Sequence, residues 1–201
     1  MLVTPMALHA AANPVVLQAP FVLSFASWLG SLIGAILLHT GTRPLVRGGH
    51  PMAPMMARTF LPLLATVLAA LTGVLVVAWL GNAWTAFWEL WVFRWLAMAA
   101  SMAVFTALFS LLGFFALLAV PLVFYQTLPA GLLAPPAAAP DWLRWLDLAP
   151  LHQSSVGLRA LLIGGPPDAV PWIALGIVLA GAIAVTWLGT LVGAAAARCR
   201  R

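Results

Sequence analysis

The charged residues of this chain are so sparse that they leave several uncharged stretches long enough to cross a lipid bilayer. Residues 60–81 carry no charge, and between residues 92 and 133 the only charged side chain is Arg94. An α-helix needs about 20 apolar residues to span a hydrocarbon core of about 30 Å. With 64% hydrophobic and 6% charged residues, the chain also lacks the polar surface that would coat a soluble globule. The sequence therefore predicts an all-α, polytopic membrane helix bundle.

Five transmembrane spans follow when breaker residues are taken as boundaries. The apolar run over residues 92–133 would, as one helix, be about twice as long as a bilayer is thick. Gly113 is the only glycine between Gly81 and Gly131, so we expect a hairpin turn there. The predicted spans, all within a single domain over residues 1–201, are 21–39, 60–81, 92–112, 114–133 and 171–195.

Two other segments are predicted to lie at the membrane–water interface. Residues 79–95 gather tryptophan and phenylalanine around Asn82, Glu89 and Arg94, as segments at the headgroup level do. In residues 141–148, charged side chains recur at every third position and tryptophans occupy the other side. This pattern is typical of an amphipathic helix that lies flat on the membrane. We expect that helix on the extracytoplasmic side.

The arginines predict the orientation of the spans. With five spans, one side holds Arg43, Arg47, Arg58 and the arginines around Cys199, while the other holds three arginines and all four acids. Basic residues favour the cytoplasmic side, which predicts an extracytoplasmic N-terminus and a cytoplasmic C-terminus in a plasma membrane such as a bacterial inner membrane. The first residues do not read as a cleaved signal peptide. An outside N-terminus then leads us to expect a preceding segment supplied elsewhere.

The sequence contains no pattern that predicts a catalytic, cofactor or metal site. It has no lysine, so it cannot form a nucleotide-binding P-loop. Its four histidines are too scattered to suggest zinc ligands, and the spacing of His152, Ser154 and Ser155 does not predict a nucleophile and its base. The net charge of +5 is not arranged as a basic stripe interleaved with aromatics. We therefore expect neither an enzyme nor a nucleic-acid-binding protein.

Two groups of residues are candidates for contacts inside the membrane. The polar triplet at the end of an apolar span predicts either interhelix hydrogen bonds or a polar path: Tyr125, Gln126 and Thr127. Small residues spaced by four predict close helix packing, within the subunit or between subunits: Gly30 and Gly34 on the first span, Gly189 and Gly193 on the last.

Several short motifs occur in an order that resembles a known family. They are Asn13-Pro14-Val15 ahead of Trp28-Leu29-Gly30, then Phe105-Thr106-Ala107-Leu108 with Gly113, then Leu128-Pro129 to Pro135-Pro136, and finally Gly157-Leu158-Arg159 before Gly164-Gly165. This order resembles the C-terminal membrane domain of the YhgE/Pip group, within the type-2 ABC exporter permease superfamily. The glycine-rich turn of that family is reduced here to Gly113, and its first helix and ectodomain are absent from this sequence.

The resemblance implies a permease-like subunit that dimerises and, with a separate ATPase, exports a hydrophobic or amphipathic substrate. It also implies a partner that carries the ectodomain. The predicted cytoplasmic loop over residues 43–58 is then the candidate ATPase contact through Arg43, Arg47 and Arg58. The alternative is a non-transporting membrane anchor, an assembly factor or a phage-entry factor.

Overall fold

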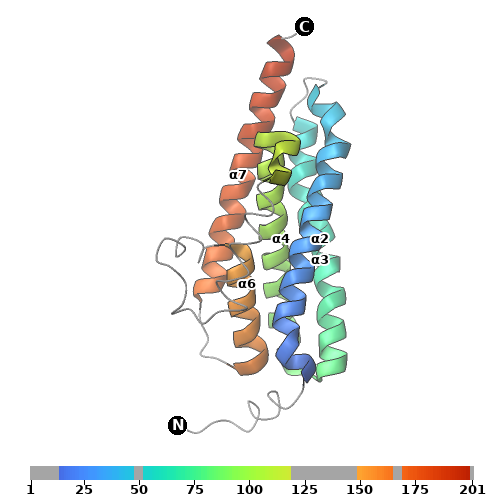
Figure 1. The fold of residues 1–201 in the computed structure, drawn as a ribbon, viewed down its shortest axis with the longest axis vertical. Helices are drawn as coiled ribbons and strands as arrows, with labels where there is room; N and C mark the ends of the chain where they lie inside the picture. The colour runs from blue at the N-terminus through green and yellow to red at the C-terminus, as the bar shows by residue number, and fades with distance from the viewer. Residues whose placement is uncertain (1–13, 48–51, 119–148, 165–168, 200–201) are drawn as a thin grey trace.

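The computed structural model describes residues 14–47, 52–118, 149–164 and 169–199, and every element within these ranges is helical. Four long helices form a bundle (Figure 1): α2 (Pro14–Arg47), α3 (Met52–Gly81), α4 (Phe87–Leu112) and α7 (Val170–Cys199). Shorter elements are η1 (Trp84–Ala86), η2 (Gly113–Phe115), α6 (Pro150–Arg159) and its π-helical continuation η6 (Ala160–Gly164). The predicted fold class, an all-α bundle of membrane type, is confirmed.

Within the described ranges, four helical segments are long and apolar enough to cross a membrane. They are Val16–Val46, Met52–Gly81, Trp84–Leu118 and Val170–Ala196. Large apolar side chains such as Leu64 and Leu68 on α3 and Ile177 and Val192 on α7 are exposed on their outer faces. Such surfaces suit lipid rather than water. The chain is therefore a multi-pass membrane protein.

Contacts between α4 and α7 show that these two helices run in the same direction. The rings of Phe93 and Trp172 lie 4.9 Å apart, and a Cβ built on Gly189 would lie 3.1 Å from the carbonyl oxygen of Ser110. Residue numbers thus rise together along α4 and α7, so these helices are parallel. Parallel helices need a return of the chain between them, as the five-span prediction requires. Most of the predicted span over residues 114–133, and all of the predicted surface helix over residues 141–148, lie outside the described residues.

The connection between α3 and α4 is much shorter than the interfacial turn predicted for residues 79–95. Asn82 has a φ of 53°, in the left-handed region that asparagine tolerates at a helix end. The amide of Ala83 donates to the carbonyl oxygen of Ala78 at 3.2 Å and closes the turn. Phe93 and Arg94 lie within α4 and are buried. For these two residues the predicted interfacial turn overlapped the predicted span over residues 92–112, and the structure has the helix.

The helices on either side of the predicted loop over residues 43–58 are longer than expected. α2 continues to Arg47 and α3 begins at Met52, which leaves only residues 48–51 between them, outside the described residues. The hydroxyl of Thr42 donates to the carbonyl oxygen of Leu38 at 2.7 Å, so this polar residue is satisfied on its own helix. The threonine and glycine residues read as helix breakers therefore do not end α2.

The helix break predicted at Gly113 is present. α4 ends at Leu112, and Gly113 has a φ of +58° with a ψ of −138°. A side chain would be strained in this backbone conformation, which glycine adopts at little cost. The chain continues through η2 into a further helical stretch at residues 116–118.

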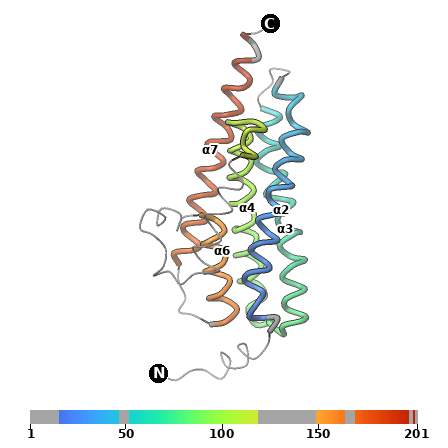
Figure 2. The backbone as a smooth tube through the Cα atoms, viewed as in Figure 1, coloured from blue at the N-terminus to red at the C-terminus, as the bar shows by residue number. Residues whose placement is uncertain are grey.

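The helix α6 was not predicted, because no helix was expected between the surface helix that ends at residue 148 and the span that begins at residue 171. It runs beside α4 and α7 over only part of the length of the bundle (Figure 2). Its residue Ser154 lies beside Ser24 of α2, and its Gly157 packs against Phe93 of α4. Further along, Leu162 shares a buried cluster with Val16, near the start of α2. α6 is therefore antiparallel to α2 and begins part-way along the bundle.

Candidate functional site: two buried arginines

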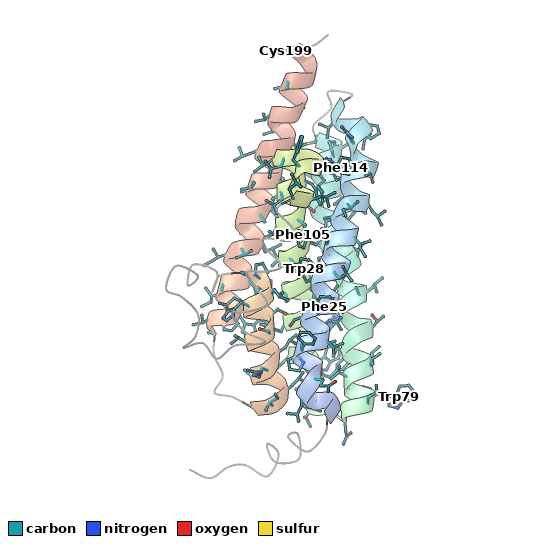
Figure 3. All side chains as sticks on the ribbon, viewed as in Figure 1. Phe25, Trp28, Trp79, Phe105, Phe114 and Cys199 are labelled. Atoms are coloured by element: carbon teal, nitrogen blue, oxygen red, sulfur yellow. The ribbon has the colours of Figure 1, made fainter. Side chains whose placement is uncertain are left out.

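Exposed tryptophans mark two levels on the bundle that are one bilayer apart. Trp79 projects from the end of α3 and is 80% exposed (Figure 3). At the other end, the indole of Trp187 on α7 donates to the hydroxyl of Thr59 on α3 at 2.9 Å. Thr59 and Trp79 are separated along α3 by about 30 Å at 1.5 Å per residue, which equals the thickness of a hydrocarbon core. Since tryptophan favours the membrane surface, we infer that the apolar core of the membrane lies between these two levels.

Arg58 lies next to Thr59, at the level of Trp187, and points into the bundle. Its side chain is only 6% exposed. Its Nε donates to the hydroxyl of Thr42 on α2 at 2.9 Å, and its Nη1 donates to the hydroxyls of Ser110 on α4 and Thr190 on α7, at 3.2 and 3.1 Å. One side chain on α3 thereby connects all four long helices. We call Arg58 with Thr42, Ser110 and Thr190 the Arg58 cluster.

The three hydroxyls of the Arg58 cluster have no unmet hydrogen bonds of their own. Thr42, Ser110 and Thr190 each donate to a backbone carbonyl one turn earlier on their helix, at 2.7, 2.8 and 2.8 Å. Each hydroxyl therefore donates one bond while its oxygen accepts another from Arg58. This arrangement solvates the buried guanidinium with neutral groups, so no carboxylate is needed.

Arg94 is buried to the same extent but has far fewer partners. Its Nε donates to the hydroxyl of Ser27 on α2 at 3.4 Å, a long distance for such a bond. Its Nη1 is buried and finds no hydrogen-bond partner in the part of the chain that the structure describes. The guanidinium lies against α3 at Gly73, where even a methyl group would collide with it.

The guanidinium of Arg94 also lies deeper in the membrane than that of Arg58. Gly73 is six residues from Trp79 on α3, which places it about 9 Å inside that surface of the hydrocarbon core. The one acid within the described ranges, Glu89, is exposed in the first turn of α4. Arg94 is thus a cation in the apolar part of the bundle without a described counter-ion.

A row of polar side chains connects Arg94 to the short helix α6. Ser24 and Ser27 are three residues apart on α2 and share a face. The hydroxyls of Ser24 and Ser154 lie 3.1 Å apart and are hydrogen-bonded. Next to Ser154, the side chains of Gln153 and Ser155 are buried as well. The otherwise apolar interior of this half of the bundle therefore contains a row of polar groups, while its outer surface is apolar.

The arginines predicted to form an ATPase contact are not a single exposed group. Arg43 is exposed near the end of α2, with its guanidinium carbon 5.7 Å from the centre of the Phe114 ring. Arg47 is the last residue of α2, and its side chain lies outside the described residues. Arg58 is buried in the bundle, so the prediction was wrong for it. The candidate polar path over residues 125–127 also lies outside the described residues.

Three of the four glycines predicted to pack helices together do so within the chain. A Cβ on Gly34 would lie 2.8 Å from the side chain of Met102 on α4. A Cβ on Gly189 would lie 3.1 Å from the backbone of Ser110 on the same helix. Gly193 lies beside Val46 of α2, at 3.4 Å. Gly30 is exposed and has no neighbour within 4 Å among the described residues. Of the two predicted kinds of contact, the described residues therefore show none within the subunit for Gly30, and a contact between subunits stays a prediction.

Sequence reasoning missed the burial of both arginines, although a signal was present for Arg94. Met98, Ser101, Phe105 and Phe109 follow Arg94 at a helical spacing of three or four, and all five residues are buried in α4. This spacing places Arg94 on the inner face of the helix. Its position among tryptophans, which favour the interface, led instead to an interfacial interpretation.

No family model matches the chain, and neither the curated proteins nor the solved structures contain a significant match to it. The resemblance to the YhgE/Pip group therefore stays a prediction. The features of the described residues that bear on function are the two buried arginines and the polar row beside Arg94.

Proposed function

We propose that this chain is the permease-like subunit of a membrane exporter that moves an amphipathic substrate together with a separate ATPase. The observation that carries this proposal is the guanidinium of Arg94, buried about 9 Å inside the hydrocarbon core with one long hydrogen bond. Ionisable groups at such depth are costly, and in membrane proteins they typically face a substrate or ion pathway. A bundle that serves only as a membrane anchor has no need of a buried ionisable group.

The helix α6 supports the same function. It begins part-way along the bundle, and its first turn receives no side-chain cap from Ala149. Non-helical backbone at membrane depth is tolerated where it is covered by protein or lines a polar cavity. Discontinuous helices of this kind often surround the substrate sites of transporters. Its buried residues Gln153, Ser154 and Ser155 add hydrogen-bonding groups to the interior next to Arg94.

The energy for transport would come from another chain. Without lysine, this sequence cannot supply a P-loop ATPase of its own. Exposed Arg43 and the C-terminal end of α7 lie at the same end of the bundle, where Figure 1 shows the C-terminus. The exposed Arg43 at that end suits a contact with a cytoplasmic ATPase, and the exposed Gly30 suits close contact with a second copy.

An export assay in cells tests the proposal. Cells with the wild-type chain, without the chain, and with Arg94→Gln are compared by mass spectrometry of lipid extracts from the cells and the medium. We expect at least one amphipathic compound to accumulate in cells without the chain, and Arg94→Gln to give the same accumulation at an unchanged level of protein in the membrane. Arg159→Gln, at an exposed arginine of α6, is the matched control and should export normally.

Two outcomes contradict the proposal. The first is that no compound depends on the chain, and the second is that Arg94→Gln exports as well as the wild type. Either result favours the alternative, a membrane anchor or assembly factor.

A further inference from the structure

We propose that Arg94 binds the acidic head group, a phosphate or a carboxylate, of an amphipathic molecule, with Ser27 as a second contact. This inference rests on the proposed function and names the class of substrate that the same site would take. It follows from what the guanidinium lacks, from what surrounds it, and from its depth in the membrane.

The hydrogen-bonding capacity of Arg94 is largely unmet. A guanidinium has five N–H donors, and the Nε of Arg94 reaches only one hydroxyl, at 3.4 Å. Its Nη1 has no acceptor within the described ranges. Arg58, equally buried, makes three such bonds at 2.9 to 3.2 Å. A buried charged donor without an acceptor is unfavourable, so an oxygen-rich anion would supply what the described helices do not.

The geometry around the guanidinium suits an anion of this kind. Gly73 has no side chain, which leaves room for the guanidinium to pack against α3. A planar guanidinium binds phosphate or carboxylate through two parallel hydrogen bonds, which a hydroxyl cannot offer. The hydroxyl of Ser27 lies next to it and would donate a further bond to the same anion.

The depth of the site favours an amphipathic molecule over a free anion. A free phosphate would have to leave water completely to reach a point about 9 Å inside the hydrocarbon core. An amphipathic molecule keeps its apolar chain in lipid while its head group enters the bundle from the surface near Trp79. The net charge of +5, with only four acids in the chain, also favours an anionic partner.

A binding experiment on the full chain tests the inference. Wild-type protein is placed in nanodiscs of phosphatidylcholine with a small fraction of phosphatidylglycerol, and native mass spectrometry measures the phosphatidylglycerol that it retains. We expect Arg94→Gln to weaken this retention about tenfold and Ser27→Ala to weaken it about two- to threefold, because the first removes a charge-assisted pair and the second a neutral bond. The control Arg159→Gln should stay within about twofold of the wild type.

Two further experiments identify which group occupies the site at Arg94. Inorganic phosphate is added to discs of pure phosphatidylcholine, and we expect no retention at millimolar concentration. Phosphate that binds as tightly as phosphatidylglycerol would show that a free anion is the ligand. If the wild type retains no acidic lipid but Asp141→Asn, Asp147→Asn or Asp168→Asn does, a carboxylate of the chain itself occupies the site. Either result overturns the inference, as does unchanged retention by Arg94→Gln.

The result remains interpretable if one variant folds poorly or the proposed function fails. Arg94→Lys keeps the charge but loses the planar fork, so we expect it to bind with intermediate affinity and to replace Arg94→Gln if that variant does not fold. Nanodiscs contain no ATPase. Acidic-lipid binding without Arg94-dependent export therefore contradicts only the proposed function, and Arg94-dependent export without binding contradicts only this inference.

Discussion

Arg58 and Arg94 are the same residue type, equally buried in the same bundle, yet their surroundings differ. Arg58 donates to three hydroxyls on three other helices. Arg94 donates to one, at a longer distance, and its Nη1 has no partner among the described residues. Burial alone therefore does not separate a structural charge from a functional one. The number of hydrogen bonds does, since a cation with several bonds to other helices holds them together and one with few bonds is poised for a ligand.

Depth strengthens this contrast. Arg58 is adjacent to Thr59, at the level of the interfacial Trp187, so part of its desolvation cost is avoided there. Arg94 reaches Gly73, about 9 Å inside the opposite surface. A cation with few partners thus lies where a lack of partners costs most.

The largest expected effect is a difference in thiol labelling between the two ends of the bundle, which reports the membrane surface that each arginine lies near. Cys199 is exposed at the Arg58 end of the bundle. In intact cells we expect a membrane-impermeant thiol reagent to leave it unlabelled until the cells are permeabilised, because basic ends stay cytoplasmic. In a Cys199→Ser background, a cysteine in place of exposed Thr85 should label in intact cells. The reverse pattern would exchange the surfaces assigned to the two arginines.

Replacing each arginine with methionine should destabilise the protein only at Arg58. Arg58→Met removes three hydrogen bonds among four helices, and we expect a loss of about 2 kcal/mol. Arg94→Met removes a poorly compensated buried charge, so we expect unchanged or greater stability. Unfolding by sodium dodecyl sulfate in mixed micelles measures both. Equal losses would show that Arg94 is a structural residue like Arg58.

The contact of Arg94 with Gly73 should appear as an energetic coupling. A methyl group at Gly73 would displace the guanidinium, so we expect Gly73→Ala to cost about 1 kcal/mol in the wild type and close to nothing in an Arg94→Ala background. Gly176→Ala is the control, since nothing lies within 4 Å of a Cβ there. The same unfolding assay completes the double-mutant cycle, and the absence of coupling would contradict the placement of the guanidinium.

Removal of single hydroxyls should give the smallest effects. Thr190→Val removes an acceptor 3.1 Å from Arg58, and we expect a loss of about 0.6 kcal/mol, the average for hydrogen bonds between membrane helices. Ser27→Ala removes the weaker bond to Arg94, and we expect a smaller loss. The ranking is checked by unfolding of the two variants side by side. A larger loss for Ser27→Ala would mean that Ser27 has a structural role.

Part of the candidate site could be read from the sequence, and part could not. The spacing of Arg94, Met98 and Ser101 was sufficient to place Arg94 on an inner face. The partners of Arg58 were not predictable, because Thr42, Ser110 and Thr190 are far apart in the chain and belong to three different helices. The helix α6 was missed because its polar residues resemble a loop until the bundle buries them.

The sequence by itself determined that the chain crosses a membrane as helices and that one helix breaks at Gly113. Both depend on local properties, the length of an apolar run and the backbone freedom of a single glycine. Only the tertiary structure decided that Arg58 donates to hydroxyls on three other helices, while Arg94 has one long bond and an Nη1 without a partner among the described residues. That distinction depends on which side chains of distant segments meet at each guanidinium, and no local pattern in the sequence carries this information.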